Sequence, residues 1–370
     1  MKKSLFIVHS LCSGGAEKVL IDILKEFDYS KNEVTLILIK KEGRYINRLP
    51  KVVKMLSIHN QTIFTRLTNK IFRNIGLYEF VTTLKLKTLN INNFDTIISF
   101  SHGDSIKYHT KVLKKAKRNI TWVHCDMWDR NKYEKVDKNL EKEYYQKMDL
   151  IVFVSNDAKI KFNLLYDNAL TIPTTVIYNL IPVDKIIEMA DSKVVSKLEK
   201  FTICTVGRFY PEKSYDRLIR VAALLKQNKF DFEIWILGEG ILMKKSQKLA
   251  IELNIDKEVI FMGFDENPYP FIKAADIFIS TSKTEALPLV ICEALCLGKP
   301  IISTKTTGPI ELLSGDFGIL TDHDDKSIYD GIVKLIQNPE LRNYYHKRAL
   351  EKSKIFDSNY TMESIYNALK

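Results

Sequence analysis

The sequence predicts an α/β protein with two doubly wound, Rossmann-like domains, and three observations lead to this prediction. The chain has 370 residues, and because a domain usually contains about 100–200 residues, two domains are expected. Short runs rich in β-branched residues alternate with helical patterns along the whole chain, which is typical of parallel sheets with right-handed crossovers. Several of these runs are almost wholly apolar, as expected for strands that helices cover on both faces.

Ten runs are predicted to be strands. In the first half of the chain they are Leu5–Val8, Val34–Ile39, Thr96–Phe100, Ile120–Val123 and Leu150–Val154. In the second half they are Phe201–Val206, Glu233–Leu237, Val259–Met262, Ile277–Ser280 and Ile301–Thr304. Helical patterns separate most of them, for example Ala16–Phe27, Ser214–Gln227 and Leu289–Leu297. This regular alternation favours parallel sheets over an antiparallel fold.

The break between the domains is predicted near Pro182–Lys200, where a strand ends at Ile177 and a charged helical segment precedes the next apolar run. We expect a first domain over residues 1–184, a linker over 185–200, a second domain over 201–350, and a helical segment over 351–370 that crosses back to the first domain. No apolar run reaches the roughly 18 residues that a membrane-spanning helix needs.

Composition narrows the class of protein. Hydrophobic residues make up 45% of the chain and charged residues 27%, which is ordinary for a globular protein. The five cysteines have no clustered spacing, which argues against a disulfide framework or a zinc site. A reducing cytoplasm fits this pattern of cysteine use.

The whole net charge of +11 lies in the first half of the chain. Residues 1–190 contain 31 Lys and Arg against 20 Asp and Glu, whereas residues 191–370 contain 25 of each kind. A one-sided basic surface indicates an anionic partner, which could be nucleic acid, anionic lipid or a phosphorylated acceptor. No nucleic-acid-binding motif accompanies the charge, so nucleic acid is not expected as the partner.

A glycine pair follows the first predicted strand. Gly14 and Gly15 stand directly before a helical pattern, where bare backbone N–H groups at a helix N-terminus can bind an anion. A tight strand–helix turn is the alternative interpretation. The full Gly-x-Gly-x-x-Gly pattern of dinucleotide sites is absent, which weakens a nicotinamide hypothesis.

A cationic loop follows the strand Phe201–Val206. Gly207 begins it, and Arg208 and Lys213 flank a segment that Pro211 stiffens. Two cations at the carboxyl end of a strand suit a diphosphate, because open α/β sheets bind their ligands there. A pair of solvated charges is the alternative.

The most specific motif places two carboxylates eight positions apart. Glu285 lies in the loop before a predicted helix, and Glu293 lies inside that helix among apolar residues. A carboxylate is costly to bury without partners, and two neighbouring ribose hydroxyls would be suitable donors. The alternative is an internal ion pair.

A histidine ends one strand of the first half. His124 follows Thr121-Trp122-Val123, and it could act as a base, as an orienting hydrogen-bond partner, or only as a satisfied structural histidine.

These residues resemble those of the retaining family-4 glycosyltransferases of GT-B architecture, and the resemblance covers essentially the whole chain. The strings that carry it are Gly207-Arg-Phe-Tyr-Pro-Glu-Lys-Ser214, Trp235-Ile-Leu-Gly-Glu-Gly240, Asn267-Pro-Tyr-Pro-Phe271, Ala275-Asp276, Glu285-x7-Glu293, Gly298-Lys-Pro300 and Gly308-Pro-Ile-Glu311. The Gly-Gly-x-Glu opening of the family is matched by Gly14, Gly15 and Glu17.

The resemblance implies roles for single residues. His124, Glu285, Arg208 and Lys213 would be the catalytic set, with the two cations stabilising the leaving nucleotide. The donor-binding set would be Gly14, Gly15, Gly207, Arg208, Lys213, Glu285, Ala286, Leu287, Pro288, Leu289 and Glu293. The family usually has glycine where this chain has Ala286, which leaves the identity of the sugar open.

The resemblance also implies the reaction. A hexose or N-acetylhexosamine would pass from a nucleotide sugar, with UDP favoured, to a growing lipid-linked or oligosaccharide acceptor of a bacterial surface polysaccharide such as capsule or O-antigen. No cofactor or metal is expected, and Asp322-His323-Asp324 is interpreted as a solvated turn. The alternatives are a nucleotide-sugar epimerase and a non-catalytic GT-B partner subunit.

One segment of the first half indicates a membrane partner. In 63–75, Ile63, Leu67, Ile71 and Ile75 share one helical face, and cations lie elsewhere on the helix. This is the pattern of an interfacial helix, although a helix packed on the sheet is equally compatible. With the cationic residues 111–118, it predicts that the basic first domain docks on an anionic membrane, as a cytoplasmic protein peripheral to the inner face.

Overall fold

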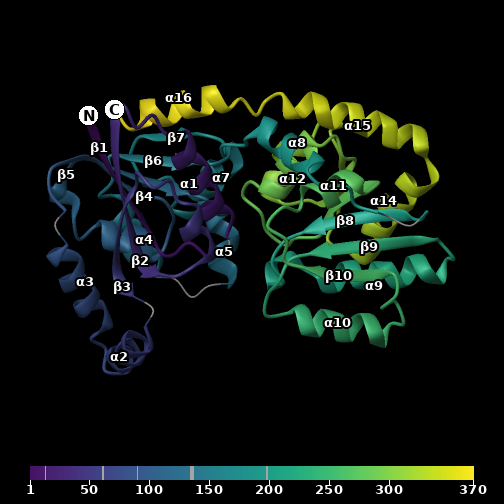
Figure 1. Ribbon diagram of the computed structural model, residues 1–370, viewed down its shortest axis with the longest axis horizontal. Helices are drawn as coiled ribbons and strands as arrows, with labels where there is room; N and C mark the ends of the chain where they lie inside the picture. The colour runs from purple at the N-terminus through teal and green to yellow at the C-terminus, as the bar shows by residue number, and fades with distance from the viewer. Residues whose placement is uncertain (13, 61, 90, 134–136, 197–198) are drawn as a thin grey trace. The chain divides into compact units, whose positions relative to one another are not determined.

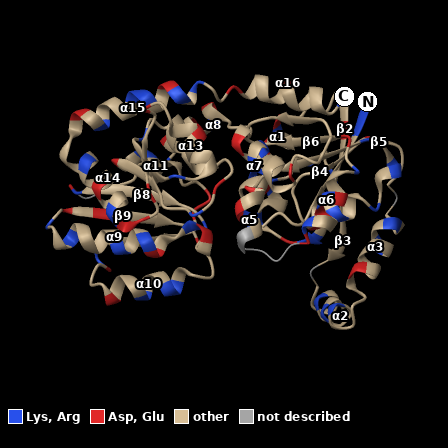
Figure 2. Ribbon diagram, turned by 180° about the vertical axis from the view of Figure 1, so that it is seen from behind, with Lys and Arg blue, Asp and Glu red and all other residues tan. Residues whose placement is uncertain are grey.

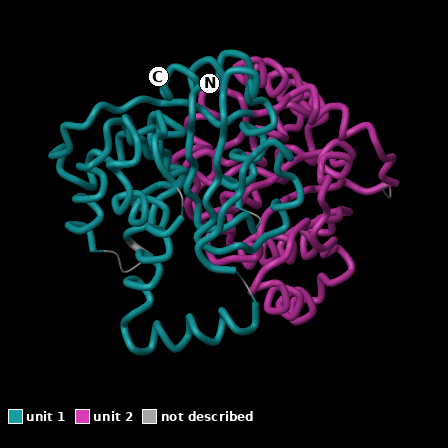
Figure 3. Tube along the Cα trace, turned by 60° about the vertical axis from the view of Figure 1, so that its left-hand side comes forward, with its two compact units in different colours: residues 1–180, 358–370 teal, residues 181–357 magenta. Residues whose placement is uncertain are grey.

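The protein is described by a computed structural model that divides into two compact units (Figure 3). Unit 1 contains residues 1–180 and 358–370, and unit 2 contains residues 181–357. The structure describes residues 1–12, 14–60, 62–89, 91–133, 137–196 and 199–370. The chain therefore passes between the units twice, after Leu180 and again after Asp357.

Unit 1 is built on a seven-stranded parallel sheet with the strand order β3-β2-β1-β4-β5-β6-β7 (Figure 1). The strands are β1 (Lys2–Val8), β2 (Asn32–Lys41), β3 (Lys54–Asn60), β4 (Phe94–Ser99), β5 (Ala116–Val123), β6 (Leu150–Phe153) and β7 (Thr174–Val176). The strand order reverses between β1 and β4. In open α/β sheets, ligands bind at the carboxyl ends of the strands beside such a reversal.

Helices connect these strands. They are α1 (Gly15–Glu26), α2 (Ile63–Asn74), α3 (Tyr78–Thr88), α4 (Asp104–His109), α5 (Met127–Tyr133), α6 (Lys138–Tyr145), α7 (Asn156–Leu165) and the distant α16 (Ser358–Ala368), with 3-10 turns η1 (Arg44–Arg48) and η2 (Leu113–Lys115). The central strands are apolar on both faces, as the full burial of Ile7, Ile37 and Ile97 shows.

The last helix, α16, belongs to unit 1 although the chain reaches it only after unit 2. The hydroxyl of Tyr366 accepts a hydrogen bond from the N–H of Asp28 at 2.7 Å, and its ring packs on Phe27 at 5.3 Å. The hydroxyl of Thr96, in β4, donates to the carbonyl of Leu369 at 3.0 Å. The C-terminal segment is thus tied to the first strands of unit 1.

Helix α2 differs from the other helices of unit 1 because none of its residues is buried. Its large apolar side chains face solvent, with Ile63 80%, Leu67 58% and Ile71 57% exposed. The side chains that are partly covered, Thr65 and Phe72 among them, lie on another side of the helix. The apolar face of segment 63–75 is therefore not the face that packs on unit 1.

Unit 2 contains a six-stranded parallel sheet with the order β10-β9-β8-β11-β12-β13. The strands are β8 (Phe201–Val206), β9 (Phe232–Leu237), β10 (Val259–Gly263), β11 (Ile277–Ser280), β12 (Ile301–Thr304) and β13 (Ile319–Thr321). This is the strand order of the Rossmann fold, with its reversal between β8 and β11. The prediction of an α/β protein with two Rossmann-like parallel sheets is confirmed.

The helices of unit 2 begin before its first strand. They are α8 (Val183–Asp191), α9 (Tyr215–Gln227), α10 (Met243–Glu252), α11 (Tyr269–Ala274), α12 (Leu289–Cys296), α13 (Thr307–Leu313), α14 (Asp325–Gln337) and α15 (Pro339–Ser353), with the 3-10 turn η3 (Pro211–Lys213). Segment 185–200, taken from the sequence as a linker, includes most of α8. This helix packs on α11 and α12, and Asn267 donates to the carbonyl of Met189 near its end at 2.8 Å.

Candidate functional site

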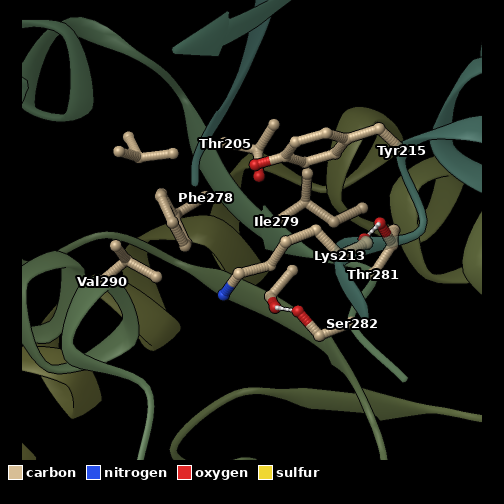
Figure 4. A pocket seen from close by; sticks show the side chains of 10 residues that line it. Thr205, Lys213, Tyr215, Phe278, Ile279, Thr281, Ser282 and Val290 are labelled. Atoms are coloured by element: carbon tan, nitrogen blue, oxygen red, sulfur yellow. Dashed lines mark hydrogen bonds between the residues drawn. The ribbon is translucent and has the colours of Figure 1, made fainter. Parts of the chain in front are cut away.

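The predicted donor residues of unit 2 lie in two loops beside the reversal in strand order. Loop 207–214 follows β8, and loop 281–288 follows β11. A small pocket lies between the two strand ends (Figure 4). Its lining residues are Thr205, Val206, Lys213, Tyr215, Phe278, Ile279, Ser280, Thr281, Ser282 and Val290. The pocket is therefore at the place where sheets of this topology bind ligands.

Lys213 and Glu285 join the two loops. The Nζ of Lys213 lies 2.5 Å from the Oε1 of Glu285, and their side chains are only 19% and 15% exposed. Ser282 donates to the same carboxylate oxygen at 2.8 Å, and the hydroxyl of Thr281 donates to the carbonyl of Lys213 at 3.0 Å. The cation and the carboxylate are thus fixed from both sides of the reversal.

Gly207 is needed here for space. A Cβ atom on this residue would lie 2.7 Å from the hydroxyl oxygen of Tyr215 and 3.3 Å from the Cε of Lys213. Tyr215 cannot move aside easily, because its ring is 5% exposed and packs on Phe209 at 4.7 Å. The glycine thus allows the side chain of Lys213 to pass over the end of β8 toward the pocket.

Arg208 is not brought to the Lys213–Glu285 pair. Its side chain is 47% exposed and its Nη2 lies 3.6 Å from the Oε1 of Glu212, while its guanidinium stacks over the ring of Tyr210 at 4.9 Å. The carbonyl of Glu212 accepts a hydrogen bond from the N–H of Lys283 at 2.7 Å, so Glu212 also joins the two loops.

Glu293 is 3% exposed within α12, as its apolar surroundings in the sequence predict. Tyr269, the first residue of α11, donates its hydroxyl to the Oε1 of Glu293 at 3.2 Å. Glu293 thus already has a protein partner, which the sequence could not reveal because the two residues are 24 positions apart.

The segment Ala286–Leu289 leads into α12, and Pro288 caps that helix without a side-chain hydrogen bond. The N–H of Ile291 donates to the carbonyl of Pro288 at 3.1 Å, so among the described residues of the first turn the N–H groups of Leu289 and Val290 remain available to a ligand. Gly308 holds the segment in place: its N–H donates to the carbonyl of Glu285 at 2.9 Å, and a Cβ atom on it would lie 2.5 Å from the carbonyl oxygen of Ala286. Ala286 does not have a positive φ, so its backbone does not require the glycine usual in the resembled family.

His124 lies in unit 1, directly after β5. Its ring packs on Phe100 at 4.5 Å, and burial lowers the pKa of His124 to about 3. The imidazole is therefore neutral at pH 7, which suits a hydrogen-bonding role better than that of a base. Its Nε2 is buried and makes no hydrogen bond within the described residues.

Gly14 and Gly15 form the start of α1, and Ser13 before them lies outside the described residues. The N–H of Gly14 donates to the Oε2 of Glu17 at 2.6 Å, and the hydroxyl of Ser10 lies 3.3 Å from the Oε1 of the same carboxylate. Glu17 therefore already supplies negative charge at this helix N-terminus, which reduces the attraction of the turn for a further anion.

The segment Asp322-His323-Asp324 has structural partners. Asp322 pairs with Lys305 at 2.8 Å, and the side chain of Asp324 caps α14 by accepting from the N–H of Ser327 at 2.8 Å. Both carboxylates thus hold the turn before α14 in place.

Residues 187–352 match the family model described as glycosyl transferases group 1. Over 96% of this chain and 96% of its own length, a Campylobacter jejuni protein is 29% identical. That relative is N-acetylgalactosamine-N,N'-diacetylbacillosaminyl-diphospho-undecaprenol 4-alpha-N-acetylgalactosaminyltransferase.

Two solved structures show the same fold over the whole chain. Anabaena HepE in complex with UDP is 18% identical, with a TM-score of 0.75 over 100% of this chain and 99% of its own. Staphylococcus aureus TarM, solved with UDP and alpha-GlcNAc-glycerol, is 14% identical, with a TM-score of 0.77 over 100% of both chains. The GT-B architecture that the sequence predicts is therefore confirmed.

Proposed function

We propose that the chain is a glycosyltransferase of group 1 type, in keeping with the family model that residues 187–352 match. It would transfer a hexose or N-acetylhexosamine from a nucleotide sugar to a lipid-linked glycan of a bacterial surface polysaccharide, with retention of the anomeric configuration. The observation that carries the proposal is the Lys213–Glu285 pair, fixed at the reversal in strand order of unit 2. The first turn of α12 starts beside it without a side-chain cap.

Arg208 and Lys213 would bind the donor diphosphate in different ways. The pair of Arg208 with Glu212 is half exposed and 3.6 Å long, and such pairs contribute at most about 1 kcal/mol. A diphosphate can therefore recruit Arg208 at little cost. Lys213 is already held in place, so it needs no reorganisation to meet the charge that grows on the leaving phosphate. Glu285 would approach the sugar, and Glu293 with Tyr269 would meet the ribose.

The names of the relatives suggest the first substrates to test. HepE and TarM were solved with UDP, and the Campylobacter relative is named for transfer of alpha-N-acetylgalactosamine to a saccharide on diphospho-undecaprenol. We therefore propose a UDP-N-acetylhexosamine as donor and a polyprenyl-diphosphate saccharide as acceptor. The cations of this site would meet the donor charge, so we propose that no metal is required.

The test is transfer from labelled UDP-N-acetylgalactosamine, UDP-N-acetylglucosamine and UDP-glucose to an undecaprenyl-diphosphate disaccharide, with and without a chelator. Lys213→Ala should lower kcat by about 10²–10³-fold, as the loss of one preorganised group at a developing charge does. Lys248→Ala removes an exposed lysine, 79% accessible, from the same unit and should change nothing. NMR of the product gives its anomeric configuration.

Three results would contradict the proposal. The first is full transfer by Lys213→Ala. The second is conversion of the donor without an acceptor, which would indicate an epimerase. The third is the absence of transfer from every nucleotide sugar while nucleotide still binds, which would favour a partner subunit.

We further propose that α2 docks unit 1 on an anionic bilayer from the cytoplasmic side. The supporting observation is the exposed apolar face of α2, together with its exposed cations Arg66, Lys70 and Arg73. Figure 2 shows blue Lys and Arg positions along α2. Apolar side chains beside cations fit the boundary between acyl chains and anionic headgroups. None of the helices in the described part of the chain combines the length and apolarity needed to cross a membrane.

Of the cationic residues 111–118, Lys111 lies 4.0 Å from Glu79 in the first turn of α3, but the last two do not extend this surface. Lys117 and Arg118 lie at the start of β5, whereas α2 follows the carboxyl end of β3. In a parallel sheet the amino ends of the strands lie on one side and the carboxyl ends on the opposite side. Lys117 also pairs with Asp95 at 2.7 Å. The proposal for the membrane therefore rests on α2 and does not use the cations at the start of β5.

Sedimentation with vesicles of phosphatidylcholine and phosphatidylglycerol tests this docking. The protein should bind vesicles that contain the anionic lipid, and Leu67→Glu with Ile71→Glu should abolish binding. Ile251→Glu is the matched control, because Ile251 is 62% exposed on α10 of unit 2. Equal binding by the α2 variant and the control would refute the proposal.

A further inference from the structure

His9 and Asp104 meet at the reversal in strand order of unit 1. His9 follows the last residue of β1, and Asp104 is the first residue of α4, shortly after β4. The Nδ1 of His9 lies 3.1 Å from the Oδ2 of Asp104, and the two side chains are 39% and 42% exposed. The pair thus spans the two strands whose carboxyl ends bind ligands in sheets of this kind, and solvent can reach it.

The backbone on both sides of the pair is fixed. The carbonyl of His9 accepts a hydrogen bond from the N–H of Lys40 at 2.8 Å, and the N–H of Leu11 donates to the carbonyl of Glu42 at 3.0 Å. Gly103 has a φ of 68°, which favours glycine, and a Cβ atom on it would meet nothing within 4 Å. The loops therefore hold His9 and Asp104 in place and leave open space next to Asp104.

Asp104 controls which nitrogen of His9 carries hydrogen. The hydrogen bond from His9 is the main cause that holds the pKa of Asp104 below its usual value. A neutral imidazole that donates through Nδ1 keeps its lone pair on Nε2. In the described part of the chain, no side chain or backbone group occupies this Nε2. His9 thus presents an oriented Nε2 to solvent, and this nitrogen accepts a hydrogen bond when the ring is neutral.

The neighbouring strand end carries His124, whose buried Nε2 is also without a partner among the described residues. Strands β1, β4 and β5 are adjacent in the sheet, so the ends of β1 and β5 are about 10 Å apart at the usual strand spacing. Two hydrogen-bonding nitrogens at this separation suit a hydroxyl-rich ligand. The carboxyl ends of β1 and β5 thus present side chains that can form hydrogen bonds with a saccharide.

We propose that His9, oriented by Asp104, binds a hydroxyl of the acceptor saccharide other than the attacking one. This proposal rests on the proposed function, because it assigns the acceptor to unit 1. His9 is an acceptor-binding residue, and Asp104 is a positioning residue that acts through it. Neither takes part in the bond changes at the anomeric carbon, so their loss should weaken acceptor binding more than it slows turnover.

The experiment measures the Kd of a short-chain polyprenyl-diphosphate N-acetylhexosamine by calorimetry, and its KM and kcat in transfer. His9→Ala should raise Kd and KM about five- to thirty-fold, as the loss of about 1–2 kcal/mol of hydrogen bonding does, with little change in kcat. His9→Gln, whose amide oxygen can accept a hydrogen bond, should recover part of the binding. The Kd of UDP should be unchanged in every variant.

Asp104→Asn should raise Kd about ten-fold alone but add nothing to His9→Ala, because it acts only through the imidazole. Glu33→Gln is the matched control: its carboxylate belongs to an exposed pair with Lys3, near the start of β1 and β2 at the other edge of the same sheet. It should bind the saccharide as the unaltered protein does.

The outcomes separate this proposal from the proposed function. If the unaltered protein binds and glycosylates the saccharide and His9→Ala does so equally well, the assignment of His9 is overturned and the function stands. Additive effects of the two substitutions would overturn the role of Asp104. If the unaltered protein binds no polyprenyl-diphosphate saccharide, this assignment fails together with the acceptor part of the proposed function.

Discussion

Gly207→Ala gives a direct test of how the pocket of unit 2 is built. The new methyl group would lie 2.7 Å from the hydroxyl of Tyr215, a distance at which one of the two groups must shift. Tyr215 is buried against Phe209 and cannot yield cheaply. Inserting a methyl group into a packed core costs about 1–3 kcal/mol. For a unit of this size, each kcal/mol lowers the Tm by about 2–4 °C.

The same substitution should impair transfer more than it impairs stability. The methyl group would also lie 3.3 Å from the Cε of Lys213 and displace the ammonium from its place beside Glu285. A misplacement of about 1 Å at a reacting centre can cost about 10²-fold in rate. The measurements are scanning calorimetry of the unfolding of unit 2 and kcat for transfer from the best nucleotide sugar.

Tyr215→Phe supplies the decisive control, because it removes the atom that the new methyl group strikes. Alone it should cost at most about 1 kcal/mol, since Thr205 is the one side chain that can form a hydrogen bond with this hydroxyl among the described residues. Combined with Gly207→Ala, it should recover most of the lost Tm and part of the lost rate. A double variant as unstable as Gly207→Ala alone would refute the reasoning.

Two further predictions concern other parts of the chain. Burial lowers the pKa of His59 and of His109 from 6.5 to about 4. Between these pH values the two side chains are therefore protonated in the unfolded chain but stay neutral in folded unit 1. The free energy of unfolding of unit 1 should be at its full value above about pH 6.5 and fall by up to about 3 kcal/mol per histidine as the pH approaches 4. Calorimetry between pH 7 and pH 4 should show unit 1 losing stability in this window, and a pH-independent Tm would contradict the assignment. Tyr269→Phe removes a hydroxyl from buried Glu293 and should cost about 1–3 kcal/mol in unfolding free energy and weaken UDP binding in titration calorimetry; unchanged affinity would argue against a ribose role for Glu293.

The sequence predicted the buried strands better than the strands at the sheet edges. Phe201–Val206 and Ile301–Thr304 were predicted with the bounds that the structure gives, because their apolar runs have no other stable place than a covered sheet. Strand β3, Lys54–Asn60, was missed, since it is an edge strand with only two buried residues and a mixed pattern. Strand β13 is three residues long and gives no periodic signal, and the equally short β7 was predicted only as a strand that ends at Ile177.

The candidate site was predictable where loops follow strands, and not where partners are distant. The spacing of Lys213 and Glu285 from the ends of β8 and β11 brings them to one edge, which the doubly wound order implies. The pairing of Arg208 with Glu212 depends on rotamers that no sequence pattern specifies. His9 and Asp104 were missed because they are 95 positions apart and belong to no recognised motif.

The face of α2 shows another limit of sequence reasoning. The periodicity of Ile63, Leu67 and Ile71 predicts a helix with an apolar side, but the same pattern fits burial against a sheet or exposure to a bilayer. Only the structure reveals that Thr65 and Phe72 lie on the partly buried side of α2 and that its apolar side faces solvent.

The return of α16 to unit 1 has a consequence for synthesis on the ribosome. Unit 2 is continuous in sequence and can fold as soon as residue 357 has emerged, whereas the edge of unit 1 around Phe27 and Thr96 stays uncovered until α16 follows. The half made first is therefore the half completed last. During that interval its unfinished surface would be a substrate for chaperones, and a truncation before residue 358 would make this nascent state permanent.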